Sequence, residues 1–368
     1  MNTTRHSVAA RIGPAATILA LALGLVLAPW AQASNDALFA KQWALGRIGA
    51  PAAWSSSTGT GVLIGIVDTG IDLNHEDLAG KVAAHTSCIG SGGNPSRCRG
   101  SAQDDQGHGT HVAGIAAATK DNGKGVAGVA PDARLVVAKA LTADGAGTTE
   151  DINAGIKWVV DRGAKVVNLS LGEPFVLSSL FGSSLAEGVQ YAWSKGAVPV
   201  LAAGNTNVLG LGIGSSQYGS LPALVVGATG PDDRVASYSS PLGNAQWSIM
   251  APGGAGTGDE AGDVLSTIWV RGKEHQYKPL AGTSMAAPHV AGAVALLLAK
   301  GATPEGAVAR ILETADPSVS CGANSPNCSG RLDAARAVSD SSGPADPAPV
   351  SPPPSGGLLD NLLGGLPL

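Results

Sequence analysis

Three short segments carry side chains that could perform acid–base and nucleophilic chemistry. Asp68 directly follows an apolar run, His108 lies in the segment GHGTHVAG, and Ser284 opens an apolar stretch in the segment GTSMAAPHVAG. A serine hydroxyl is a weak nucleophile at neutral pH. It needs a base with a pKa near the working pH and a third group that orients the base. An acid, an imidazole and an alcohol are the side-chain types that such nucleophilic catalysis requires.

Each segment also has a simpler structural explanation. An Asp before Gly70 commonly forms a turn, and a serine at the start of a helix is commonly an N-cap. His108 and His111 would share a helix face and could bind a metal, but no acidic third ligand has a familiar spacing and the glutamate of an HExxH motif is absent. We therefore expect one histidine to move a proton and the other to pack in the interior.

The elements that must bring these residues together alternate along the chain. Short apolar runs, typical of strands covered on both faces, occupy residues 62–67, 135–138, 165–169, 198–203 and 223–226. Threonines precede residues 150–162, and a glycine follows both 150–162 and 178–195, which indicates helices there. This alternation predicts an α/β fold with a mostly parallel twisted sheet and helices on both faces. Ligands of such sheets bind beyond the carboxyl ends of the strands.

Composition excludes several classes of protein. The chain has 368 residues, of which 44% are hydrophobic and 14% charged, so it is neither disordered nor a coiled coil. Its 52 Gly and 23 Pro follow no G-X-Y period, which excludes collagen. The formal net charge of −5 provides no basic field for nucleic acid.

The two ends of the chain differ in composition from its centre. Arg5 and Arg11 precede an apolar run at 15–27, and the triplet AQA ends at Ala33, which predicts a signal peptide over residues 1–33 and a secreted (extracellular or periplasmic) protein. The apolar run is shorter than the roughly 20 residues of a membrane span. Residues 34–339 form the predicted domain, 340–357 a Pro/Ser/Gly-rich linker, and 358–368 a short apolar tail.

The four cysteines are expected to pair, because an exported chain meets an oxidising compartment. Four cysteines allow three connectivities. Cys88 and Cys98 flank one Gly/Pro/Ser-rich segment and Cys321 and Cys328 flank another, so two local disulfides are the simplest arrangement. A zinc site would need closer cysteine spacing or neighbouring histidines.

Taken together, the segments DTGID, GHGTHVAG and GTSMAAPHVAG closely resemble those of the subtilisin-like serine peptidases (subtilases), over about residues 35–338. The resemblance implies that Ser284 is the nucleophile, that His108 is its general base, and that Asp68 orients the imidazole. It assigns Asn205, in the segment AAGN, to the oxyanion hole. Asp72, His111 and His289 then take structural roles.

The resemblance also implies how substrate is bound. Ser170, Leu171 and Gly172 match the segment that pairs with the substrate main chain, and residues 143–147, with Ala143 and Gly145, would supply the facing edge. A peptide bound as an added strand must be extended. We therefore expect protein or peptide substrates that are unfolded or flexible, and a monomeric enzyme with no nucleic-acid partner and no membrane span.

A structural calcium ion is a further implication of the family. Asp36, Asp77 and Asn122 match ligands of its strong calcium site, and the glycine-containing loop 119–126 would add carbonyl oxygens, as a hard cation prefers. The alternative is that these are solvated acids beside a plain turn.

One family feature is not expected here, and two other functions compete. Most secreted subtilases carry a folding pro-domain after the signal, whereas here the predicted cleavage leads directly to Ser34, so we expect folding aided by the disulfides or the C-terminal tail.

An α/β-hydrolase esterase needs its acid and histidine after the serine, and only His289 follows Ser284. An inactive binding protein with this fold would normally lack one of the three catalytic side chains, and none is missing.

Overall fold

The computed structural model describes residues 1, 34–171, 185–205, 218–219 and 221–339. Residues 2–33 of the predicted signal peptide lie outside the described residues, as do Gly172, the predicted linker 340–357 and the predicted tail 358–368. Residues 178–184 of the second predicted helix are outside them too. The helices and strands all belong to the unit that begins at Ser34.

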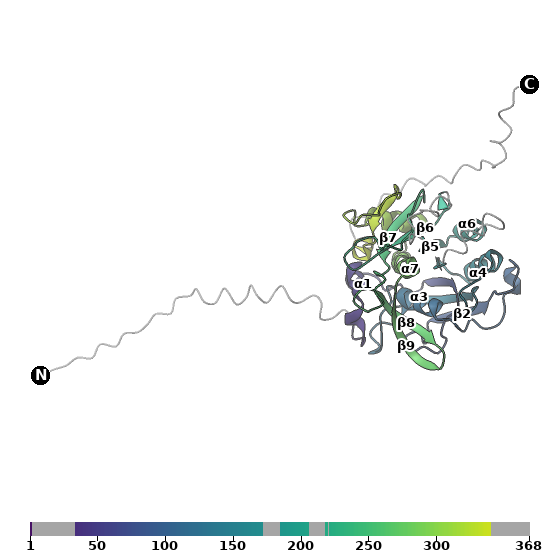
Figure 1. Cartoon of the computed structure of the whole chain (residues 1–368), viewed down its shortest axis with the longest axis horizontal. Helices are drawn as coiled ribbons and strands as arrows, with labels where there is room; N and C mark the ends of the chain where they lie inside the picture. The colour runs from purple at the N-terminus through teal and green to yellow at the C-terminus, as the bar shows by residue number, and fades with distance from the viewer. Residues whose placement is uncertain (2–33, 172–184, 206–217, 220, 340–368) are drawn as a thin grey trace, which may run out of the picture. The chain divides into compact units, whose positions relative to one another are not determined.

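Strands of the described chain form one parallel sheet of eight, with the order β10-β7-β6-β5-β4-β1-β3-β2. Every neighbouring pair in this sheet is parallel, which confirms the predicted architecture. Figure 1 shows β5, β6 and β7 side by side. The strands are β1 (Leu63–Asp68), β2 (Val82–Ser87), β3 (Arg134–Lys139), β4 (Val166–Leu169), β5 (Val198–Ala202), β6 (Leu224–Thr229), β7 (Trp247–Pro252) and β10 (Cys328–Arg331).

Helices pack on both faces of this sheet, as the sequence predicts. α4 (Thr149–Asp161) and α6 (Ala186–Ser194) contact each other, and α3 (His108–Ala117) and α7 (Thr283–Ala299) form a second pair (Figure 1). A Cβ on Gly65 would lie 2.8 Å from Val159 of α4, so this glycine lets α4 approach β1 closely. Side chains alternate along a strand, so Ile64 and Ile66 point to the opposite face. The fold is therefore a three-layer α/β sandwich.

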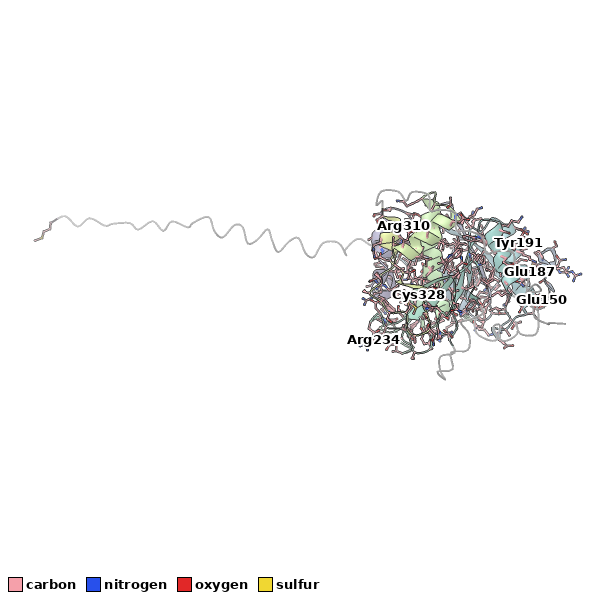
Figure 2. The ribbon with its side chains drawn as sticks, turned by 90° about the horizontal axis from the view of Figure 1, so that it is seen from above. Glu150, Glu187, Tyr191, Arg234, Arg310 and Cys328 are labelled. Atoms are coloured by element: carbon pink, nitrogen blue, oxygen red, sulfur yellow. A yellow bond between two sulfur atoms is a disulfide. The ribbon has the colours of Figure 1, made fainter. Side chains whose placement is uncertain are left out.

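The helix ends follow the predicted capping chemistry. The Thr148 hydroxyl accepts the backbone N–H of Asp151 at 3.1 Å at the start of α4, and Gly163, with φ of 92°, follows the end of this helix. Figure 2 labels Glu187 and Tyr191 of α6, which bond to Lys157 and Asp161 of α4 at 2.6 and 2.5 Å. The remaining described helices are η1 (Phe39–Lys41), α1 (Trp43–Arg47), α2 (Ala50–Ala53), η2 (Pro95–Arg97), α8 (Pro304–Glu313) and α9 (Ala334–Val338). Within the described ranges, no helix has the length and apolar character that crossing a membrane requires.

An antiparallel ribbon outside the main sheet was not expected from the sequence. It consists of β8 (Val264–Val270) and β9 (Lys273–Leu280), and β8 packs against α3. The hydroxyls of Ser266 and Thr267 donate to the backbone carbonyls of His111 and Thr110, at 2.9 and 2.8 Å. The ribbon therefore covers α3 along the length that carries both histidines.

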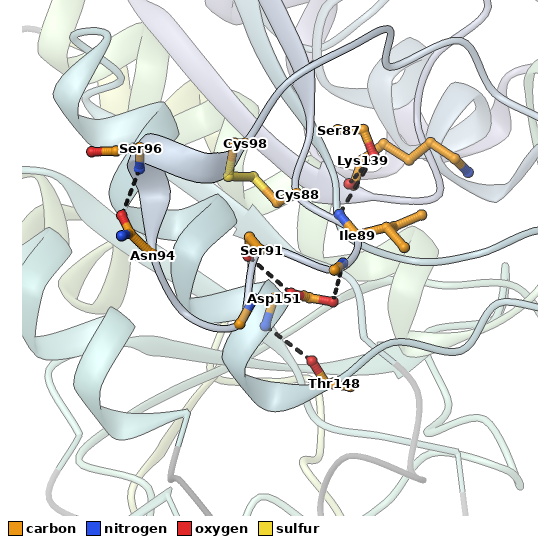
Figure 3. The surroundings of a disulfide bond; sticks show 12 residues. Ser87, Cys88, Ile89, Ser91, Asn94, Ser96, Cys98, Lys139, Thr148 and Asp151 are labelled. Atoms are coloured by element: carbon orange, nitrogen blue, oxygen red, sulfur yellow. Dashed lines mark hydrogen bonds between the residues drawn. A yellow bond between two sulfur atoms is a disulfide. The ribbon is translucent and has the colours of Figure 1, made fainter.

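Both disulfides form between the cysteines that the sequence placed around short loops. Cys88 pairs with Cys98, and Cys321 pairs with Cys328. Figure 3 shows the first loop against the start of α4, where the Asp151 carboxylate accepts the N–H groups of Gly90 and Gly92 at 2.8 and 3.0 Å and the Ser91 hydroxyl at 2.8 Å. A buried carboxylate and a covalent bond thus hold the same loop.

Candidate active site

The carboxyl end of β1 and the first turn of α3 bring Asp68 and His108 together. Asp68 is the last residue of β1 and is fully buried, and its Oδ1 lies 2.7 Å from His108 Nδ1. The same oxygen accepts the backbone N–H of Thr69 at 2.7 Å. A carboxylate beside Nδ1 favours the tautomer that carries the proton there. The other ring nitrogen, Nε2, is then left as the proton acceptor.

Two glycines of the sequence motifs make this approach possible. A Cβ on Gly109 would lie 2.2 Å from the carbonyl oxygen of Gly70 and 3.1 Å from the Cβ of Asp68. Gly70 has φ of 122°, and a Cβ there would lie 2.5 Å from the carbonyl oxygen of Ala102. A side chain at Gly109 would push α3 away from the end of β1, and one at Gly70 would clash with the segment that leads to α3. The glycines beside the acid and the histidine are therefore required by close backbone contact.

The pKa of His108 is shifted by its surroundings. Burial acts to lower the pKa, but the charge of Asp68 and its hydrogen bond outweigh burial, and the charge of Asp104 adds to their effect, so the pKa lies above the ordinary value. The side chain of His108 retains 23% of its exposure, which leaves the imidazole accessible from solvent. The site therefore favours the imidazolium that forms when His108 accepts a proton.

The other two histidines of the motifs are buried and neutral. Burial lowers the pKa of His111 to about 3 and that of His289 to about 4. His111 Nε2 lies 2.8 Å from the carbonyl oxygen of Lys278, and His289 Nδ1 lies 2.8 Å from that of Met285. Each ring thus donates one hydrogen bond to the backbone, which fits the packing role expected for it.

The N-terminus of α7 is attached to the same edge of the sheet. Ser284 is the second residue of α7, and its carbonyl oxygen accepts the hydroxyl of Ser170 at 2.8 Å. Ser170 directly follows β4, and β4 pairs with β1 through Asn168 and Ile66. The serine of the third motif therefore lies at the carboxyl edge where Asp68 ends β1.

Asn205 follows β5 and contacts the first residue of α7. Its Oδ1 accepts the backbone N–H and the hydroxyl of Thr283 at 2.9 and 3.0 Å, which leaves Nδ2 as the donor facing away from Thr283. A Cβ on Gly282 would lie 3.5 Å from Asn205 Nδ2 and 3.6 Å from the backbone N of Ser284. Two N–H donors therefore border the space that Gly282 leaves open at the positive end of the α7 dipole. Such a space suits a developing oxyanion.

The segments expected to bind substrate flank the Asp68–His108 pair. β4 and β3 lie on either side of β1, so Ser170 and Leu171 follow one neighbour and residues 140–147 follow the other. Residues 142–146, which include Ala143 and Gly145, form a turn closed by hydrogen bonds of 2.7 and 2.9 Å between Thr142 and residues 146 and 145. A Cβ on Gly145 would lie 3.8 Å from Nε2 of Gln106, two residues before His108.

The three residues expected to bind calcium also come together. Asn122 donates its backbone N–H to Asp36 Oδ1 at 3.0 Å and its side-chain amide to Asp77 Oδ1 at 2.8 Å. Asp77 Oδ2 accepts the N–H of Val126 from the same loop at 2.8 Å. Across the described ranges, no group of three or more His, Cys, Asp or Glu side chains could hold a metal. Two carboxylates and one amide offer the oxygen ligands that calcium prefers, although the Asn122 amide here presents its N–H to Asp77 and its Oδ1 accepts the N–H of Lys124 at 2.8 Å.

One residue at this edge was missed by the sequence analysis. Asp104 is buried and accepts the hydroxyl of Thr69 at 3.0 Å and the N–H groups of Gly107 and Thr110 at 2.9 and 3.0 Å. Burial acts to raise its pKa, but the hydrogen bonds from Thr110 and Gly107 outweigh burial and lower the pKa. An acidic residue shortly before a helix is a recognised capping signal that could have identified it.

Comparison with known proteins agrees with this geometry. The chain matches the model of the "Subtilase family" over residues 59–342. It is 38% identical to thermitase of Thermoactinomyces vulgaris over 285 residues, covering 77% of this chain and 91% of that protein. It is 40% identical to subtilisin Savinase of Lederbergia lenta over 261 residues, covering 70% and 84% of the two chains.

A solved structure extends the likeness to the fold. A protease of Pseudoalteromonas arctica PAMC 21717 superposes with a TM-score of 0.67 at 32% sequence identity, covering 83% of this chain and 98% of that one. Sequence, fold and the arrangement at the carboxyl edge of the sheet agree, and the chain belongs to the subtilase family of serine endopeptidases.

Proposed function

We propose that Asp68, His108 and Ser284 are the catalytic residues with which this serine endopeptidase hydrolyses peptide bonds. His108 Nε2 takes the proton of the Ser284 hydroxyl as Oγ attacks the substrate carbonyl carbon. Asp68 holds the Nδ1–H and stabilises the imidazolium. The imidazolium then protonates the leaving amine as the C–N bond breaks. Water, activated by the same imidazole, hydrolyses the acyl-enzyme and regenerates the free serine.

The oxyanion of each tetrahedral intermediate would be stabilised by two donors. These are Asn205 Nδ2 and the backbone N–H of Ser284, which border the space beside Gly282. Donors that are already oriented need no reorganisation as charge develops on the oxygen. Asn205 is suited to this role because Thr283 holds its Oδ1.

Substrate would bind as an extended strand between the segments that follow β3 and β4. Ser170, Leu171 and Gly172 would pair with one edge of the peptide main chain, and Ala143 and Gly145 with the other. Backbone pairing requires a local segment free of its own secondary structure. We therefore propose unfolded or flexible proteins as the substrate class, cleaved by a monomeric enzyme.

The observation that carries this proposal is the Asp68–His108 hydrogen bond of 2.7 Å at the sheet edge to which Ser170 attaches the backbone of Ser284. The test is labelling with a serine-directed sulfonyl fluoride. We expect one label per chain, on Ser284, and loss of casein cleavage in proportion to labelling. Ser284→Ala should be folded and inactive, whereas Ser55→Ala, at an exposed serine, should retain full activity. Labelling at another serine, or casein cleavage by the Ser284→Ala variant, would refute the assignment.

We further propose that Asp36, Asp77 and Asn122 hold a structural calcium ion. Asp36 precedes the first helical turn, Asp77 follows β1, and Asn122 lies in the loop that leads to Val126, so the ion would join three segments distant in sequence. Calcium bound only to the folded state stabilises it by mass action. Thermal unfolding should shift to lower temperature in excess chelator and return on addition of calcium. An unchanged midpoint at low free calcium would show that these oxygens bind no ion.

We also propose that residues 1–33 direct export and are removed after Ala33, that 34–339 are the catalytic domain, and that 340–357 link it to a terminal tail at 358–368. N-terminal sequencing of protein recovered outside the cytoplasm should begin at Ser34. Intact mass and light scattering of the same sample test whether the tail is retained and whether the enzyme is monomeric. A mature protein that begins well after Ser34 would overturn the cleavage assignment.

A further inference from the structure

A second buried carboxylate lies beside the proposed catalytic pair. Asp104 is 1% exposed. Its Oδ1 accepts the Thr69 hydroxyl at 3.0 Å and the N–H groups of Gln106 and Gly107 at 3.1 and 2.9 Å. Its Oδ2 accepts the N–H and the hydroxyl of Thr110 at 3.0 and 2.5 Å. Five hydrogen bonds thus converge on one side chain that takes no part in the proposed chemistry.

These hydrogen bonds reach both elements that carry the catalytic pair. Thr69 directly follows Asp68, at the end of β1. Gly107, the N-cap of α3, and Thr110, in its first turn, lie on either side of His108. The Thr69 hydroxyl also accepts the N–H of Gly109 at 2.9 Å, so the two elements are joined a second time. Asp104 therefore determines how the turn that carries His108 sits against the turn that carries Asp68.

The charge of Asp104 is balanced differently from that of its neighbour. Asp105 is paired with Lys139 of β3 at 2.7 Å, and 43% of its side chain is exposed. Asp104 receives hydrogen bonds only from neutral groups among the described residues. Its charge is therefore less compensated and less screened than that of Asp105, and it acts on His108 in addition to Asp68.

Other elements packed around His108 contribute little charge. β1 supplies Asp68, and β3 supplies Lys139, whose ammonium also donates to the Thr69 carbonyl at 2.6 Å. The β8–β9 ribbon meets α3 through hydroxyl and backbone groups, and α3 and α7 themselves carry His111 and His289, which are neutral. Asp68 and Asp104 are thus the two carboxylates whose charge favours a cationic His108.

We propose that Asp104 is a positioning residue that holds Asp68 and His108 in register and stabilises the protonated imidazole during turnover. A neutral cap would stabilise α3 without affecting the ionisation of His108. The proposal rests on the proposed function for its kinetic consequence. Its electrostatic consequence is independent, because the protonation of His108 can be measured in a protein that does not turn over.

The first test is an NMR titration of His108 in Ser284→Ala protein, with and without Asp104→Asn. Asparagine keeps the shape but loses the charge, and its NH₂ group replaces one accepting oxygen. We expect the His108 midpoint to fall by about half a unit to one unit, as for the loss of one nearby, poorly screened charge. Asp105→Asn is the matched control and should move the midpoint by much less. Equal His108 midpoints in Ser284→Ala protein with and without Asp104→Asn would overturn the proposal.

The second test is kinetic and uses the active enzyme. Asp104→Asn should lower kcat by roughly tenfold with KM nearly unchanged, because the imidazole is misplaced while the substrate edges are intact. The acid limb of kcat/KM should move to lower pH with the NMR midpoint. A rise in KM at constant kcat would contradict a positioning role. If parent protein cleaves no protein substrate, the proposed function fails, and the NMR result still decides the role of Asp104.

A second variant that keeps the Asp104 carboxylate tests the proposal even if Asp104→Asn does not fold. Thr69→Val removes the hydroxyl that joins Asp104 to Gly109 and leaves the carboxylate in place. We expect a several-fold loss of kcat with a smaller shift of the His108 midpoint than for Asp104→Asn. Full kcat in folded Thr69→Val protein would exclude the proposed link between β1 and α3.

Discussion

Replacing Asn205 by aspartate separates the two functions of this side chain. Oδ1 anchors Thr283 through hydrogen bonds of 2.9 and 3.0 Å, whereas Nδ2 lies near the backbone N of Ser284 across the space beside Gly282. Aspartate keeps an acceptor for Thr283 and replaces the donor by a carboxylate oxygen. The anchor therefore survives, and the contact with the oxyanion turns from attraction to repulsion.

The expected loss of kcat follows from the removal of the Nδ2 donor, and the expected stability follows from the hydrogen bonds that Oδ1 keeps with Thr283. Removing one oxyanion donor costs roughly 10²–10³-fold in kcat, a value known from a subtilisin and therefore from this family. The negative charge adds to this loss, so we expect kcat of Asn205→Asp to fall by at least about 10³-fold. The anchoring hydrogen bonds become charge-assisted and lie at the positive end of the α7 dipole, so thermal stability should be equal to or above that of the parent.

Asn205→Ala provides the comparison, because it removes donor and anchor together. Its kcat should fall by about 10²–10³-fold, and it should also lose about 1–2 kcal/mol of stability, since the Thr283 donors lose their acceptor. The assays are initial rates on a chromogenic peptide over a range of concentrations, and thermal unfolding at the same pH. Asn244→Asp, at an exposed turn, controls for the added charge.

For Asn205→Asp, KM and thermal stability are as informative as kcat. KM should change little for Asn205→Asp, because the oxyanion forms only after binding. A kcat within threefold of the parent would refute the assignment of Nδ2 to the oxyanion. A large loss of stability in Asn205→Asp would instead refute the anchoring role of Oδ1.

Three further predictions concern ionisation and the first disulfide loop. Because the pKa of His108 is raised, kcat/KM should increase with pH through a midpoint above 6.5, and a rate that is flat down to pH 4 would exclude His108 as the base. The pKa of His111 is lowered from 6.5 to about 3, so below pH 6.5 the folded state binds fewer protons than the unfolded state and the free energy of unfolding falls as pH falls. In His111→Gln, the free energy of unfolding, measured with urea, should therefore fall by about 2 kcal/mol less between pH 7 and 5 than in the parent. Asp151→Ala should cost roughly 2–3 kcal/mol and speed amide exchange in the Cys88–Cys98 loop, whereas Glu305→Ala, at an exposed acid in the first turn of α8, should do neither.

The central strands could be predicted because their burial is uniform. Residues 165–169 were expected as a strand and β4 is Val166–Leu169, since a run buried on both faces must be apolar throughout. β2, with the sequence VAAHTS, was missed because it is an edge strand with mixed burial. β9 is largely polar and none of its residues is buried, so it has no apolar pattern that would predict its pairing with β8.

The residues of the site were predictable where a short motif also contains the glycines that its geometry requires. The glycines in DTG and GHGTH are needed where α3 contacts the end of β1, so the local sequence carries the constraint that unites Asp68 and His108. Asp104 has no such local signature beyond an acid before a helix. Its importance comes from Thr69, 35 residues earlier, which only the folded chain places beside it.

By itself, the sequence determined the side chains available for catalysis, the strands on which they end and the cysteines that pair, because each depends on residues close together in the chain. The tertiary structure decided which groups share an edge of the sheet. The attachment of Ser284 to Ser170, the capture of Thr283 by Asn205 and the contact of Asp104 with both β1 and α3 join residues remote in sequence. Such contacts depend on strand order and helix packing, and neither is encoded in any single segment of the chain.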